Sequence, residues 1–185
     1  LIQWAAGLLG GLILGFLILV YVAPSQLGSS KKENLGEYNP INDVTGWQYF
    51  SGQFKKIVEA DQKAGVMTKN APIVIHKWFP GGHILFYTAN PMNLKVIAIG
   101  NLEDVHKFAW LNQSQQGLKL GEDAYCIVPS NLPANPVALY GAYFEKVLTP
   151  DTIPVITKGV VLRNFYVYRL KNCNRIPAPI LGKHK

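Results

Sequence analysis

The sequence predicts a mixed α/β protein: an N-terminal transmembrane helix followed by a small Rossmann-like, three-layer domain with a mostly parallel sheet and an antiparallel edge. Three observations predict it. All 18 basic and 11 acidic side chains follow an apolar stretch at residues 1–23. Short apolar runs then alternate with helical patterns, which is the order of a parallel sheet with crossover helices. The last apolar segment alternates in polarity, as antiparallel strands do.

The composition fits one membrane segment and one soluble domain. The chain has 185 residues, 49% hydrophobic and 16% charged, and only two cysteines. These values exclude a disordered chain, a coiled coil, a collagen-like chain and a disulfide scaffold. The part after the apolar stretch is long enough to bury its own core. The predicted organisation is a transmembrane helix at 1–23, a linker at 24–42, an α/β domain at 43–172 and a basic tail at 173–185.

Residues 1–23 carry no charge and are long enough to cross a hydrocarbon core of about 30 Å. Trp4 and Tyr21 lie near the two ends of the stretch, where aromatic rings prefer the membrane interface. Pro24 ends the helix. A secretory signal peptide is the competing interpretation, but the stretch lacks its basic N-terminal region. We therefore expect a membrane span.

Three glycines recur at intervals of four along the span: Gly7, Gly11 and Gly15. Their two overlapping GxxxG motifs would let another helix approach closely on one face. The alternative is that glycine is simply common in membrane helices. The spacing, together with the missing initiator methionine, predicts that this helix packs on other transmembrane helices of a longer parent protein.

An amphipathic helix is predicted from Thr45 to Ala64. Thr45 and Gln48 have the spacing of a capping box, and Gly65 supplies the C-terminal cap. Apolar side chains recur at helical intervals on one face. These are Trp47, Phe50, Phe54, Ile57 and Val58.

Short apolar runs predict the strands of the sheet. Three runs suit buried parallel strands, at 72–77, 95–99 and 124–128. Helices are predicted between them at 82–89 and 102–111. The alternating segment 160–170, together with 140–148, is predicted to form an antiparallel addition at the edge of the sheet.

No catalytic, cofactor or metal site is predicted in this chain. The sequence contains no GxGxxG, P-loop, GxSxG or HExxH motif. His76, His83 and His106 lack ligand-type spacing, so structural roles are expected for them. Cys126 is expected to be a small buried hydrophobe, and a disulfide between Cys126 and Cys173 stays open as an alternative.

Basic residues concentrate at the C-terminal end. Residues 1–145 hold ten basic and ten acidic side chains, whereas residues 146–185 hold eight basic side chains and one acidic one. We expect membrane or lipid-phosphate contacts from Lys158, Arg163, Arg169, Lys171 and Arg175. The alternative is a solvated edge strand, since lysines protect exposed edges. Nucleic-acid binding is disfavoured because no such motif accompanies the charge.

The order of short motifs resembles the C-terminal part of bacterial membrane glycosyltransferases of the protein O-mannosyltransferase/aminoarabinose-transferase superfamily. The resemblance starts with the glycine-rich span ending at Ala23 and covers most of residues 43–172. Its motifs are DVTGW at 43–47, HILFY at 83–87, VIAIG at 96–100, WLNQ at 110–113, GEDAYCIV at 121–128 and FEKVL at 144–148.

The resemblance implies a many-span enzyme that moves a sugar from a polyprenyl-phosphate carrier to an acceptor outside the cytoplasm. It also implies an inner-membrane protein whose soluble domain is periplasmic. The family's catalytic acidic residues lie in the first extracytoplasmic loop, outside this chain, so none is carried over. The expected partners are the bilayer, other transmembrane helices, the lipid-linked sugar and its acceptor. Two alternatives are a single-span anchored binding or scaffold domain, and a nucleotide-binding Rossmann domain, which the missing glycine motif opposes.

Overall fold

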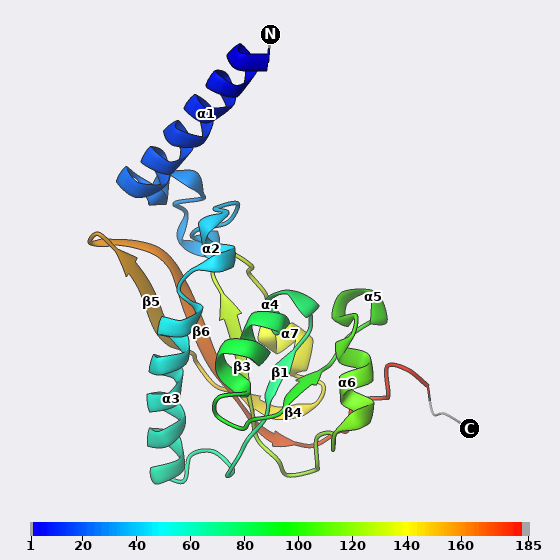
Figure 1. Ribbon diagram of the computed structural model, residues 1–185. Helices are drawn as coiled ribbons and strands as arrows, with labels where there is room; N and C mark the ends of the chain where they lie inside the picture. The colour runs from blue at the N-terminus through cyan, green and yellow to red at the C-terminus, as the bar shows by residue number, and fades with distance from the viewer. Residues whose placement is uncertain (1, 183–185) are drawn as a thin grey trace.

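A computed structural model describes residues 2–182 (Figure 1). The first residue of the predicted span and residues 183–185 of the predicted tail lie outside the described residues. Helix α1, Ile2–Val22, projects from one end of a mixed α/β domain. Its 21 residues are long and apolar enough to cross a membrane, and the helix is compatible with a membrane anchor or a signal sequence.

The face of α1 that carries Gly7, Gly11 and Gly15 has no partner within the described part of the chain. A Cβ added at Gly7, Gly11 or Gly15 would meet nothing within 4 Å. None of the described α1 side chains is buried. The predicted packing of this face on other helices therefore stays a prediction.

The segment predicted as a linker folds back on the domain. It contains the 3₁₀ turns η1, Pro24–Leu27, and η2, Lys32–Asn34, and the short helix α2, Ile41–Val44. The buried Asn39 amide donates to the Pro24 carbonyl at 2.8 Å. The Ser130 hydroxyl donates to the Leu35 carbonyl at 2.7 Å, which ties this segment to the loop after β3.

Helix α3, Trp47–Lys63, confirms the predicted amphipathic helix, but its predicted capping box is wrong. Gly46 is the N-cap, and the Thr45 hydroxyl instead donates to the Ile41 carbonyl. The reason is that α2 ends at this point, so Thr45 serves the C-terminus of α2. The apolar face of α3 is buried as predicted, with the exception of the half-buried Ile57. The buried residues of that face are Trp47, Phe50, Phe54 and Val58.

The three predicted parallel strands pair as expected. β1 (Ile73–Ile75) lies between β2 (Val96–Ala98) and β3 (Ala124–Pro129), and both pairings are parallel. The crossover after β1 contains α4, Trp78–His83, and a π-helical turn η3, Ile84–Ala89. The crossover after β2 contains α5, Leu102–Val105, and α6, Phe108–Ser114.

The antiparallel part of the sheet is larger than predicted. β6, Val160–Cys173, pairs with β3 on one side and with both β4, Phe144–Val147, and β5, Asp151–Thr157, on the other. β6 is therefore an interior strand rather than the predicted edge, and β4 and β5 form the outer side. The sequence analysis missed β5 because Pro154 interrupts its pattern. An outer strand tolerates a proline, which has no N–H to donate.

The domain is mixed α/β as predicted, but the Rossmann-like three-layer arrangement is not confirmed. One face of the sheet packs against α3 and η3 in the larger core cluster. The opposite face is covered by the short helix α7, Pro136–Tyr140, and neighbouring segments. α6 covers the outer edge of β2, where the Asn112 side chain bonds the N–H and carbonyl of Ala98 at 3.0 and 2.7 Å.

Gly46→Ala should destabilise the domain by about 2–3 kcal/mol, since Gly46 has a φ of +78° and an added Cβ would lie 3.0 Å from Val155 Cγ1. Gly65→Ala is the matched control, because Gly65 has a φ of +65° with nothing within 4 Å of an added Cβ. That control should lose about 1 kcal/mol, the left-handed backbone cost alone. Urea unfolding of both variants in nanodiscs measures the difference, and equal losses would contradict the tight packing of Gly46.

Candidate functional site

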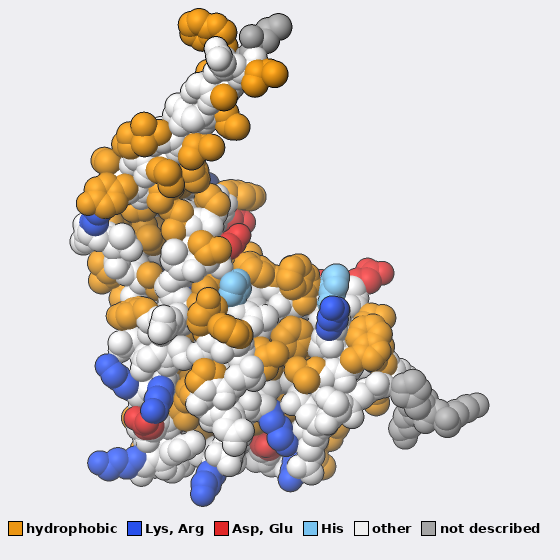
Figure 2. Space-filling view, in the orientation of Figure 1, with side chains coloured by type: hydrophobic (Ala, Val, Ile, Leu, Met, Phe, Trp, Pro, Cys, Tyr) orange, Lys and Arg blue, Asp and Glu red, His pale blue; other side chains and the backbone are white. Residues whose placement is uncertain are grey.

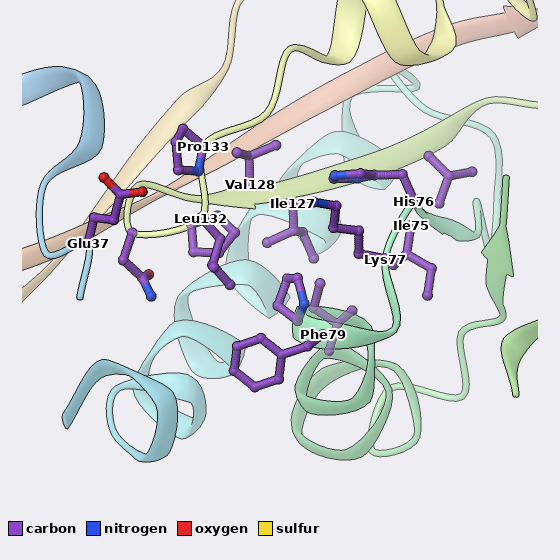
Figure 3. Close-up of a pocket in the computed structure, with 14 residues that line it drawn as sticks. Glu37, Ile75, His76, Lys77, Phe79, Ile127, Val128, Leu132 and Pro133 are labelled. Carbon is purple, nitrogen blue, oxygen red and sulfur yellow. The ribbon is translucent and has the colours of Figure 1, made fainter. Parts of the chain in front are cut away.

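A pocket lies at the carboxyl ends of β1 and β3 (Figure 3). Its volume is about 250 Å³, and it is enclosed by the ends of both strands, the start of α4, the 129–133 loop and Glu37 of the segment before α2. Ligands of open parallel sheets bind at this end of the strands. The strands β1 and β3 run toward the side of the domain from which α1 leaves (Figure 1). The pocket is therefore the best-placed binding site in the described part of the chain.

Polar groups of different chemistry face one another across this pocket. His76 and Lys77 extend β1 on one side, and Glu37 lies on the other (Figure 3). Asn131 adds a buried amide. Burial, followed by the charge of Lys77, lowers the pKa of His76 below its usual 6.5, so the imidazole is neutral at pH 7. The pocket thus offers one cation, one carboxylate and neutral donors and acceptors, which suits a small polar group without large net charge.

The pocket is small. Sites for complete small-molecule ligands usually measure about 300–1,000 Å³. Its volume of about 250 Å³ lies just below that range. Sequence analysis missed this site because its polar residues come from three separate segments.

The buried Arg163 guanidinium lies next to this pocket through its contact with Asn131. Nη1 donates to Asn131 Oδ1 at 3.3 Å, and Nη2 donates to the Thr45 carbonyl. The guanidinium also lies over the rings of Trp47 and Phe165, at 4.5 and 4.4 Å from their centroids. Burial lowers the pKa of Arg163 to about 9. The side chain holds the start of α3, the 129–133 loop and β6 together.

Two other basic residues of β6 form ion pairs with acidic residues. Arg169 binds Asp61 in bidentate fashion, at 2.7 and 2.9 Å, and Asp151 at 2.7 Å. Lys171 binds the buried Asp123 at 2.6 Å. Both positions are explained by the interior location of β6, which brings the side chains onto acids from distant segments.

The five residues predicted to contact lipid therefore do not form one basic surface. Arg163 is fully buried, and Arg169 and Lys171 are neutralised by acidic partners. Arg175 is exposed in the C-terminal segment. Lys158 alone lies next to α1: its Nζ is 3.3 Å from the Tyr21 ring centroid and donates to the Tyr21 carbonyl. Of the five residues, Lys158 and Arg175 are the two that are exposed and have no acidic partner among the described residues, so the prediction of lipid contact now depends on them.

The three histidines occupy separate environments. His76 lines the pocket, His83 stacks on Trp47 at 4.6 Å between ring centroids, and His106 lies near Trp78. Across residues 2–182, no three potential metal-binding side chains of the His, Cys, Asp and Glu types cluster together.

Both cysteines are buried free thiols in the structure. Cys126 and Cys173 belong to the same core cluster, on the side of the sheet covered by α7. Burial raises the pKa of Cys126 to about 12. Such a thiol is protonated and unreactive at neutral pH, which agrees with the predicted role of a small buried hydrophobe.

Stability should fall as the pH is lowered from about 7 to about 5, because His76 and His83 are held neutral in the folded protein. Burial lowers the pKa of both imidazoles, with Lys77 adding to the effect at His76 and Arg163 at His83. The unfolded chain therefore binds protons first, and stability present above pH 6.5 is lost as the pH falls through the folded-state pKa values.

Urea unfolding across this pH range tests the effect. The double variant His76→Asn/His83→Asn should lose less stability on acidification than the wild type. His106→Asn, at an exposed position, should behave like the wild type. An unchanged pH dependence in the double variant would show that these two imidazoles are not responsible.

Comparison with known proteins adds no assignment: no family model, curated protein or solved structure matches this chain. The proposal of function therefore rests on the motifs and on the geometry described above.

Proposed function

We propose that this chain is the last transmembrane helix and the extracytoplasmic domain of an integral-membrane glycosyltransferase. The complete enzyme would move a sugar from a polyprenyl-phosphate carrier to an acceptor at the outer face of the inner membrane, with its catalytic acidic residues in a loop outside this chain. The domain would be a reduced, Rossmann-like accessory domain on the periplasmic side. The observation that carries the proposal is the ordered set of motifs from DVTGW at 43–47 to FEKVL at 144–148.

Specific structural roles of the motif residues support this proposal. In the first motif, Gly46 permits the left-handed backbone at the start of α3, and Trp47 fills the core. In WLNQ, Asn112 caps the outer edge of β2. In GEDAYCIV, Asp123 accepts hydrogen bonds from the Thr68 and Asn172 N–H groups and pairs with Lys171. Each of these motif residues therefore has a structural role in the domain.

The direction in which the pocket faces also supports an accessory role. The pocket lies at the end of the sheet nearest α1, so a domain anchored by α1 would hold it near the membrane surface. A lipid-linked sugar presents its polar part at that level. A small pocket with neutral and paired charged groups would suit recognition of one sugar unit or of the acceptor, while the chemistry takes place on acidic residues elsewhere in the enzyme.

A transfer assay tests the proposal. Membranes containing the complete encoded polypeptide are supplied with radiolabelled polyprenyl-phosphate mannose or polyprenyl-phosphate aminoarabinose, the donors after which the superfamily is named. Loss of label from the carrier is expected with the complete polypeptide and not with residues 1–185 alone. Replacing the acidic residues of the first outward loop by their amides should abolish transfer at unchanged protein level. Transfer by residues 1–185 alone would contradict the proposal.

A further inference from the structure

Large apolar side chains are exposed at the end of the domain from which α1 leaves. We call six of them the apolar rim. The apolar rim consists of Tyr38, Val44, Trp78, Leu102, Ile156 and Val160, with exposed fractions between 42% and 87%. A soluble surface seldom gathers side chains of this kind without a partner.

The apolar rim is assembled from four segments that are distant in the sequence. Val44 lies in α2, Trp78 opens α4, Leu102 opens α5, and Ile156 and Val160 flank the turn between β5 and β6. Figure 1 shows α2, α4, α5 and the β5–β6 turn together at the α1 end of the domain. On the face shown in Figure 2, many hydrophobic side chains lie toward this end, among acidic and histidine side chains, while most of the visible Lys and Arg side chains lie at the opposite end.

One contact fixes the position of the β5–β6 turn of the apolar rim relative to α1. Lys158, in the β5–β6 turn between Ile156 and Val160, lies over the Tyr21 ring and bonds the Tyr21 carbonyl. Tyr21 is 71% exposed near the C-terminal end of α1, where a membrane-spanning helix meets the headgroups and where aromatic and basic side chains are favoured. The part of the apolar rim formed by Ile156 and Val160 thus lies next to the end of α1 that meets the headgroups.

Charge around the apolar rim is balanced. Its segments, residues 31–44, 76–79, 101–107 and 156–160, contain five basic and five acidic side chains. Electrostatic attraction to anionic lipids therefore contributes little net force. Apolar and aromatic groups at headgroup depth remain as the source of membrane contact.

We propose that the apolar rim inserts into the headgroup region of the bilayer that α1 crosses. The domain is then held on the membrane at several points. The mouth of the pocket is also held close to the lipid surface, because the lining residues Glu37 and Lys77 each directly precede a rim residue in the chain. This proposal requires a membrane-spanning α1 and holds whether or not the parent protein is a glycosyltransferase.

Depth-dependent quenching in nanodiscs tests the insertion. The full chain carries one new cysteine, Val44→Cys, Leu102→Cys or Ile156→Cys, labelled with an NBD fluorophore, in phosphatidylcholine nanodiscs with and without headgroup-proximal doxyl lipids. Leu120→Cys is the matched control, since Leu120 is 67% exposed in the segment between α6 and β3. Wild-type protein treated in the same way corrects for labelling of Cys126 and Cys173.

NBD at the three rim positions should be quenched about twofold more than at the control position, because an inserted apolar surface lies about 5–10 Å into the interface. Neither anionic lipid nor high salt should change this ratio, given the balanced charge. Quenching no greater than at Leu120 would overturn the proposal. So would a blue-shifted emission without lipid quenching, which would mean that protein rather than lipid covers the rim. Matched far-UV circular dichroism shows that each labelled chain is folded.

Discussion

Replacing Trp47 with alanine is expected to lower the free energy of unfolding by about 3–5 kcal/mol, the cost of deleting a large buried aromatic side chain. Trp47 is 1% exposed at the start of α3. Its ring stacks on His83 and lies under the Arg163 guanidinium, and its indole N–H donates to the Asp43 carbonyl at 3.1 Å. The substitution therefore opens a cavity and leaves the buried Arg163 cation without one of its two aromatic neighbours.

Trp110→Ala provides the matched control, because Trp110 is 55% exposed on α6. Its loss should cost well under about 1 kcal/mol, as surface substitutions usually do. Urea unfolding in nanodiscs, followed by far-UV circular dichroism, compares the two variants independently of tryptophan emission. Similar losses for both variants would contradict the role of Trp47 as a buried residue of the larger core cluster.

The second large effect is expected for Asp61→Ala. Removing one partner of a buried ion pair costs about 3–5 kcal/mol, because the remaining charge is left without compensation. The Asp61 side chain is 8% exposed and binds Arg169, which is 15% exposed, through two bonds of 2.7 and 2.9 Å. Asp61 also accepts a hydrogen bond of 2.9 Å from the Tyr125 hydroxyl. Asp151 still contacts Arg169 in the variant, so we expect the lower end of this range.

Glu59→Ala is the control for Asp61→Ala, since Glu59 lies on the same helix in an exposed pair with Lys55 at 3.8 Å. An exposed pair of this kind contributes about 0.3–0.5 kcal/mol. Chemical unfolding under identical conditions separates the two variants. A small effect for Asp61→Ala would show that the ion pair between Asp61 and Arg169 does not stabilise the interior position of β6.

The elements with strong local patterns were predictable from the sequence. The apolar helix α1, the amphipathic helix α3 and the parallel strands β1, β2 and β3 follow from hydrophobic periodicity within each segment. These elements carry their pattern in neighbouring residues, so no long-range information is needed to recognise them.

The remaining features depend on contacts between distant segments. The interior position of β6 follows from pairing with β3, β4 and β5, and β5 itself was hidden by Pro154. The burial of Arg163 and the ion pairs of Arg169 and Lys171 follow from that position. For the same reason, the pocket at the ends of β1 and β3 could not be predicted, because its polar groups come from three segments that are distant in the sequence.

The upstream reading frame of the gene that encodes Leu1 tests the central claim most directly. If the chain is the last part of a lipid-linked-sugar glycosyltransferase, the reading frame should encode several further hydrophobic spans, with a pair of acidic residues in the first outward loop. A start codon within a few residues of Leu1 would contradict the claim. It would leave a single anchored α/β domain without an enzymatic parent.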